Sequence, residues 1–163
     1  MDGQEKHSQT IDFGGVRVQL QVDGDGIGSA TYSGLLGPSN FLALSVLVMR
    51  AGAAHGARGL MYCLGQAATC FSPESLAGAY DELAPQLKAL PVAFVTNDGQ
   101  ADLHRLVVQR AAAHGLLRRQ FAHEAEARDW LLRTSRTIDH NLSWWQQRQR
   151  RPARSGPGAE SEG

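Results

Sequence analysis

The sequence is poor in cysteine, in net charge and in metal-binding patterns. Two cysteines in 163 residues are too few for a disulfide framework, and Cys63 and Cys70 do not have the spacing of a CxxC redox motif. Sixteen basic and sixteen acidic residues balance to zero, which excludes a globally basic nucleic-acid binder and an acidic solvating protein. The six histidines include no pair at the i, i+4 spacing of a helical metal site. We therefore expect neither a metal nor another cofactor.

Long apolar runs are also missing. No stretch approaches the roughly 20 apolar residues that a membrane-spanning helix needs, and the N-terminal residues lack the apolar core of a signal peptide. We therefore expect a cytoplasmic protein. Hydrophobic residues make up 42% of the chain, which is enough for one domain with a sizeable core.

Both ends of the chain have the composition of tails. Residues 1–10 are polar and show no periodicity, and residues 137–163 are rich in Gln, Arg, Gly, Pro and Ser. Such segments bury too little apolar surface to offset the loss of chain entropy on folding. We therefore predict disorder over residues 1–10 and 137–163, and a folded domain over residues 11–136.

The N-terminal part of this domain is predicted to be a hairpin followed by a helix. Apolar residues alternate with polar ones over 16–22, a glycine-rich turn follows at 23–26, and residues 27–36 form the partner strand. Because a strand and not a helix follows these glycines, we interpret them as a turn and not as a phosphate-binding loop. Ser39 is the expected cap of a helix over 40–54.

That helix is apolar nearly all round, so it is either covered on two sides or contacts a partner. If it is not buried, Phe41, Leu44 and Val48 are the residues expected to form a surface for a second copy or another protein.

The remaining elements alternate between strands and helices. Residues 60–64 and 92–95 are short apolar runs typical of strands buried on both faces. Between them, Ser72 is a good helix cap before Pro73, and an apolar stripe continues to Leu90. A helix over 102–114, a strand over 119–121 and a helix over 124–132 complete the order β-β-α-β-α-β-α-β-α. This order predicts a single layered α/β domain with helices packed on a mixed sheet.

The most suggestive loops follow the two buried strands. Ligands of open α/β sheets bind at the carboxyl ends of the strands, where the strand order reverses, so Thr96, Asn97 and Asp98 are candidate ligand-loop residues. The alternative is a plain turn in which Asp98 caps the next helix. The sequence has no GxSxG motif and no cysteine in a protease-like context, and we do not expect an enzyme.

The C-terminal segment combines tryptophan with arginine. Trp144 and Trp145 precede Arg148, Arg150, Arg151 and Arg154. Aromatic and arginine side chains together can bind single-stranded nucleic acid or an anionic membrane surface. The alternative is a basic tail with no specific partner.

Three segments resemble the SpoIIAA-like branch of the STAS superfamily, which includes proteins labelled STAS/SEC14. They are residues 67–76, which contain a Ser-Pro-Glu helix start, the strand Pro91–Val95, and the strand at 119–121 followed by Glu-Ala-x-x-x-Trp-Leu within 124–131. The similarity covers about residues 12–133.

This resemblance implies a non-catalytic regulatory module. Anti-anti-sigma members bind a partner kinase and are switched by phosphorylation of a serine at the start of the corresponding helix, where Ser72 and Ser75 are the candidate acceptors. The Asp-Ser-Ser-Gly motif of those members is absent, and Cys63 stands where they often have aspartate.

We therefore expect a regulatory or protein-interaction module that contacts a protein partner or forms a homodimer. The alternatives are a module that binds a small molecule or lipid near Thr96, and an adaptor that binds nucleic acid or membrane through residues 137–163.

Overall fold

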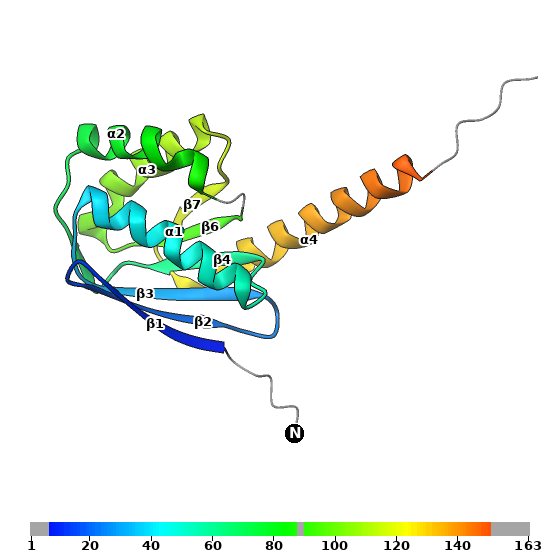
Figure 1. Ribbon diagram of the computed structural model, residues 1–163, viewed down its shortest axis with the longest axis horizontal. Coiled ribbons are helices and arrows are strands. Elements are labelled where there is room, and N and C mark those ends of the chain that lie inside the picture. Colours follow the sequence, from blue (N-terminus) through cyan, green and yellow to red (C-terminus); the bar gives the residue numbers. More distant parts are fainter. Residues whose placement is uncertain (1–6, 88–89, 151–163) are drawn as a thin grey trace, which may run out of the picture.

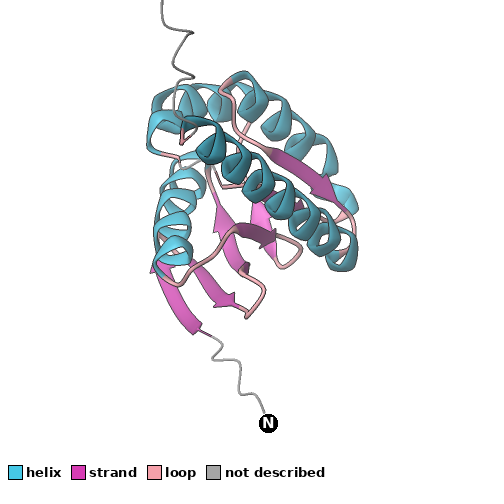
Figure 2. Ribbon diagram, turned by 90° about the vertical axis from the view of Figure 1, so that its right-hand side faces the viewer, coloured by secondary structure: helices cyan, strands magenta, loops and turns pink. Residues whose placement is uncertain are grey.

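The computed structural model describes residues 7–87 and 90–150. Over these residues the chain forms a single α/β domain, in which a mixed seven-stranded sheet carries helices on both faces (Figure 1; Figure 2). The predicted fold class is confirmed. None of the helices in these ranges has the length and apolar character needed to span a membrane.

The sheet has an antiparallel half and a parallel half. The first three strands form an antiparallel meander, and the following strands add in parallel in the order β1-β2-β3-β4-β6-β7. β5 pairs in parallel with the last residues of β3. The strands are β1 (His7–Phe13), β2 (Val16–Val22), β3 (Ile27–Leu36), β4 (Gly59–Cys63), β5 (Ala67–Thr69), β6 (Val92–Val95) and β7 (Arg118–Phe121).

The helices divide between the two faces. The α-helices are α1 (Pro38–Ala54), α2 (Pro73–Leu83), α3 (Ala101–Ala113) and α4 (Glu124–Gln149), and short 3-10 turns lie at Ala84–Gln86 and Asp98–Gln100. Side chains of α1, α2 and α3 pack in one large apolar cluster. Leu131 of α4 packs in a second cluster with Met61 and Ala93, which point to the other face because side chains alternate along a strand.

The sequence signals for the hairpin and for α2 are confirmed. β2 and β3 pair on either side of the 23–26 turn, and Asp23 Oδ1 accepts hydrogen bonds from the backbone N–H groups of Asp25 and Ile27. The Ser72 hydroxyl caps α2 by accepting from the Ser75 N–H at 3.2 Å. However, α2 ends at Leu83 and does not reach Leu90, because Pro85 lacks the N–H that would continue the helix.

The start of α1 differs from the prediction. Its N-cap is Gly37 and not Ser39, and Pro38 is the first helical residue. The Asn40 side chain accepts a hydrogen bond from the Gly37 N–H at 2.6 Å. Asn40 therefore satisfies a backbone donor at this helix end, and Ser39 lies inside the helix and does not cap it.

The predicted disorder at the two ends is wrong wherever the structure describes them. Residues 7–10 belong to β1, which pairs with β2 through backbone groups and needs no apolar face of its own because it lies at the edge. Residues 137–149 continue α4, since a helix satisfies its own backbone hydrogen bonds without burying side chains. Residues 1–6 and 151–163 lie outside the described residues.

Candidate functional site

A cavity of about 340 Å³ lies where β4 and β6 end. We call it the carboxyl-edge pocket. Its walls come from β3, from the loops after β4 and β6, and from the first turn of α4. It is lined by Thr31, Cys63, Gly65, Gln66, Val95, Thr96, Asn97, Ala122 and Glu124.

The pocket exists because one strand position of the sheet is interrupted. β4 pairs with β3 as far as Cys63, the chain then bulges through residues 64–66, and β5 rejoins β3 three residues further along, at Gly34. A concave, polar space is left beside β3, within the size range of small-molecule sites.

Gln100 holds this bulge in place. Its side-chain amide donates to the Leu64 carbonyl at 2.7 Å and to the Ala67 carbonyl at 2.9 Å. Its side-chain oxygen accepts from the Asn97 N–H at 3.1 Å. Because Gln100 is buried, these bonds tie the loop after β6 rigidly to the loop after β4.

The chemistry of the pocket is that of hydrogen bonding. Glu124 carries the only formal charge among the residues that line it. Burial, with the Glu124 carboxylate beside it, raises the pKa of the half-buried Cys63 thiol to about 12. At neutral pH the thiol is therefore protonated and a poor nucleophile. Hydroxyl and amide groups of Thr31, Gln66 and Asn97 complete the polar lining.

Two of the three predicted ligand-loop residues line this pocket. Thr96 is buried and its hydroxyl accepts from the Gln120 side chain at 2.9 Å. Asn97 is exposed and its amide donates to the Gly65 carbonyl at 3.4 Å. Asp98 does not line it and begins the 3-10 turn instead.

The expected reversal of strand order is wrong. From β3 to β7 the parallel strands follow one another in chain order, since α1, α2 and α3 all cross on the same face. No switch-point crevice forms, and the N-terminal turn of α4 supplies the missing wall. Thr31 and Glu124 were not predicted because each reaches the site from a distant part of the chain. Gln100 lies only three residues after Asn97, but the sequence does not show that its side chain is buried.

The candidate phosphorylation sites form part of a helix cap. Ser72 and Ser75 are exposed, and each side chain accepts a hydrogen bond from the other residue's backbone N–H. Neither lines the carboxyl-edge pocket. Their phosphorylation stays a prediction.

The predicted partner surface on α1 is wrong. Phe41, Leu44 and Val48 have no exposed surface and belong to the main apolar cluster. The sheet covers one side of α1 while α2 covers another, so the helix is apolar nearly all round because it is enclosed.

His104 is a buried polar residue that the sequence did not reveal. The α3 residue is fully buried between the rings of Phe41 and Phe94. Neither ring nitrogen has a hydrogen-bond partner among the described residues. Burial lowers the pKa of His104 to about 4, so the ring is neutral at physiological pH.

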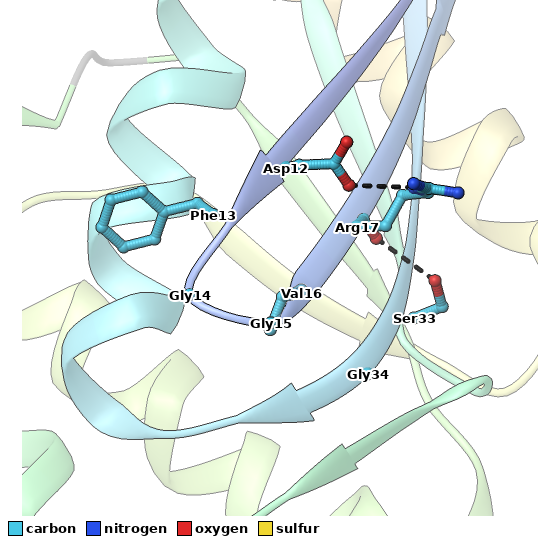
Figure 3. A pocket seen from close by; sticks show the side chains of 8 residues that line it. All are labelled: Asp12, Phe13, Gly14, Gly15, Val16, Arg17, Ser33 and Gly34. Carbon is cyan, nitrogen blue, oxygen red and sulfur yellow. Dashed lines mark hydrogen bonds and ion pairs between the residues drawn. The ribbon is translucent and has the colours of Figure 1, made fainter.

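A larger hollow of about 490 Å³ lies beside the loop between β1 and β2 (Figure 3). Its polar groups are already paired, since Arg17 bonds Asp12 at 2.9 Å and the Ser33 hydroxyl donates to the Arg17 carbonyl. Phe13 points away from that pair in Figure 3. The backbones are close here, and a Cβ on Gly34 would lie 2.5 Å from the Gly15 carbonyl oxygen. We interpret this hollow as a consequence of strand packing.

The described residues contain no group of three or more metal-ligating side chains placed to hold an ion. Compared with models of known protein families, the chain matches none, and a comparison with curated proteins also gives no match. The resemblance to STAS proteins therefore stays a prediction.

Proposed function

We propose that this protein is a non-catalytic regulatory module that binds a small polar molecule in the carboxyl-edge pocket. The observation that carries the proposal is the pocket itself, with its convergent hydroxyl and amide groups on a backbone fixed by Gln100. Rigid placement of a few polar groups is what gives small-molecule sites their specificity. The resemblance to STAS proteins supports a regulatory role.

The charge of the pocket limits the ligand class. The Glu124 carboxylate is its only charged group and would repel an anion. Amide and hydroxyl groups donate and accept hydrogen bonds. The expected ligands are therefore neutral or carry an amine, and they are polar and not lipid-like.

Gly65 provides a way to test the pocket. A Cβ at this residue meets nothing within 4 Å and its backbone is not in the left-handed region, so Gly65→Leu fills the pocket without strain. Gly78, on α2, is also open and lies outside the pocket, which makes Gly78→Leu the matched control.

The assay is ligand-observed NMR with mixtures of small amines, polyols and carboxylic acids. We expect amines or polyols to bind the wild type and the Gly78→Leu variant but not Gly65→Leu, and carboxylic acids to bind none of them. The proposal fails if no compound binds at millimolar concentration, or if Gly65→Leu binds as the wild type does.

We also propose that the protein acts in the cytoplasm. Cys63 and Cys70 are both free thiols, and unpaired cysteines are usual in reducing compartments. Expression of a fluorescent fusion in cells, followed by fractionation, tests this location.

A further inference from the structure

The C-terminal half of α4 is little covered by the rest of the described chain. Leu131 and Ser135 are buried against the domain and Ile138 is half-buried, but every residue from Asp139 to Arg150 is exposed. Figure 1 shows this half of the helix projecting from the rest of the molecule. A free helix of about a dozen residues is marginal in water, so a partner would stabilise it.

The apolar stripe of α4 continues along this projecting half. Leu131, Ser135, Ile138, Leu142 and Trp145 follow one another at steps of four, three, four and three residues, which keeps them on one side of a helix. Leu142 and Trp145 are 55% and 59% exposed. The side of α4 that packs on the sheet near Leu131 is therefore uncovered where the helix extends beyond the edge of the sheet.

The width of this stripe indicates what covers it. Asn141 and Gln146 flank Leu142 and Trp145, so the apolar side is only two residues per heptad wide. That is the seam of a coiled coil, whereas a helix lying in a membrane surface has a broad apolar face. The stripe fits one other helix.

We propose that the other helix is the α4 of a second copy, packed antiparallel along residues 138–149. A two-fold axis between Ser143 and Trp144 places Leu142 of each copy against Trp145 of the other, and Ile138 against Gln149. The overlap is about 18 Å long at 1.5 Å per residue. The pattern of this segment is therefore complementary to itself.

The orientation follows from what the domain already covers. In a parallel pair, the two domains would compete for the same space, because Leu131 and Ser135 of each helix lie under their own sheet. In the antiparallel pair the domains lie at opposite ends.

Charge also favours the antiparallel arrangement. Asp139 and Arg150 are eleven residues apart, about three turns, and so lie on the same flank of the helix. Antiparallel packing brings that flank of one copy beside the same flank of the other. Arg150 of each copy then approaches Asp139 of its partner, which already pairs with Arg58 of its own chain.

Two hollows beside Ile138 enlarge the contact. One, of about 190 Å³, separates α4 from Leu90 and Pro91, and the other, of about 350 Å³, separates it from Leu117 and Arg119. Leu117 is 45% exposed. In the proposed dimer, the end of the partner helix lies over these hollows and covers part of their surface.

The adjacent tryptophans provide the test. Trp145 lies on the seam, whereas Trp144 lies about 100° round the helix and packs under the Arg148 guanidinium, 4.3 Å from its ring centre. Both are exposed in the single chain, so neither substitution should unfold the domain. Circular dichroism of each variant checks this.

Sedimentation velocity from about 1 to 300 µM measures the dimer, since contacts of this small size give dissociation constants near the micromolar range. We expect a reversible monomer–dimer equilibrium that Trp145→Ala weakens at least 10-fold and Trp144→Ala leaves within 2-fold. A wild type that is monomeric throughout overturns the proposal, as does a dimer that Trp145→Ala does not weaken.

A cross-linking experiment tests the register. In chains with Cys63 and Cys70 replaced by serine, Ile138→Cys and Gln149→Cys variants should form a disulfide when mixed and not when separate. Disulfides within either variant alone would overturn the antiparallel arrangement. Binding of a monomeric wild type to phosphatidylserine vesicles, lost in both tryptophan variants, would overturn it by assigning the surface to a membrane.

Discussion

His104 makes stability depend on pH in a way that one substitution removes. The ring is buried between two phenylalanines without a hydrogen-bond partner among the described residues, and its pKa is about 4 in the folded chain against 6.5 in the ordinary case. The unfolded chain therefore binds a proton at this residue between pH 6.5 and 4 while the folded chain does not. Stability falls as the pH falls through this range.

These pKa values set the size of the effect. Relative to pH 7, protonation of the unfolded chain at His104 costs about 2 kcal/mol of folding stability at pH 5, and about 3 kcal/mol below pH 4. His104→Leu removes the titrating group and keeps a similar volume. Since no hydrogen bond is lost, we expect the variant at pH 7 to be as stable as the wild type, or about 1 kcal/mol more stable.

The assay is urea unfolding of the wild type and of His104→Leu at pH 7 and pH 5. The wild type should lose about 2 kcal/mol more than the variant between the two pH values. His140→Gln, at an exposed residue on α4, is the control substitution of a histidine outside the core. Equal losses in the wild type and His104→Leu would refute the reasoning, as would a variant destabilised by several kcal/mol at pH 7.

Other residues give sharp expectations. Gln100→Leu removes three hydrogen bonds of a buried side chain, to the Leu64 and Ala67 carbonyls and from the Asn97 N–H, and should lower the free energy of unfolding by about 3 kcal/mol in urea titrations. Gly34 has a φ of +109° and lies against backbone, so Gly34→Ala should lower the free energy of unfolding by about 3 kcal/mol. Gly78 lies in open space on α2, so Gly78→Ala should raise the free energy of unfolding by about 0.5–1 kcal/mol. Equal shifts in melting temperature for the two variants would contradict this. The Cys63 thiol, with its pKa raised to about 12, should react with iodoacetamide at pH 8 at least about 100-fold more slowly than exposed Cys70 by mass spectrometry.

Local patterns predicted the elements whose burial is periodic. Alternating valines placed β2, continuous apolar runs placed β4 and β6, and the Ser-Pro-Glu start placed α2. The β1 strand was missed because most of its residues are polar and its pairing is a backbone property, although Ile11 packs against the core. The continuation of α4 was missed because a polar composition indicates only that side chains are not buried. An exposed helix can form without burying its side chains.

The site was predicted only in part, for a similar reason. Thr96 and Asn97 follow a buried strand, so the sequence alone predicted that they lie at the carboxyl end of that strand. Glu124 reaches the same pocket from the first turn of α4, on the opposite face of the sheet. An apolar helix such as α1 likewise does not reveal whether a sheet or a partner covers it.

The two edges of the sheet bear on aggregation. An uncovered edge strand offers free backbone groups to strands of other molecules, and polar or charged residues and short length oppose this. β1 carries His7, Gln9 and Asp12 among its exposed residues, and β7 is only four residues long and carries the exposed Arg119. Both edges are thus poor templates for strand addition, which protects the folded domain from growing into fibres.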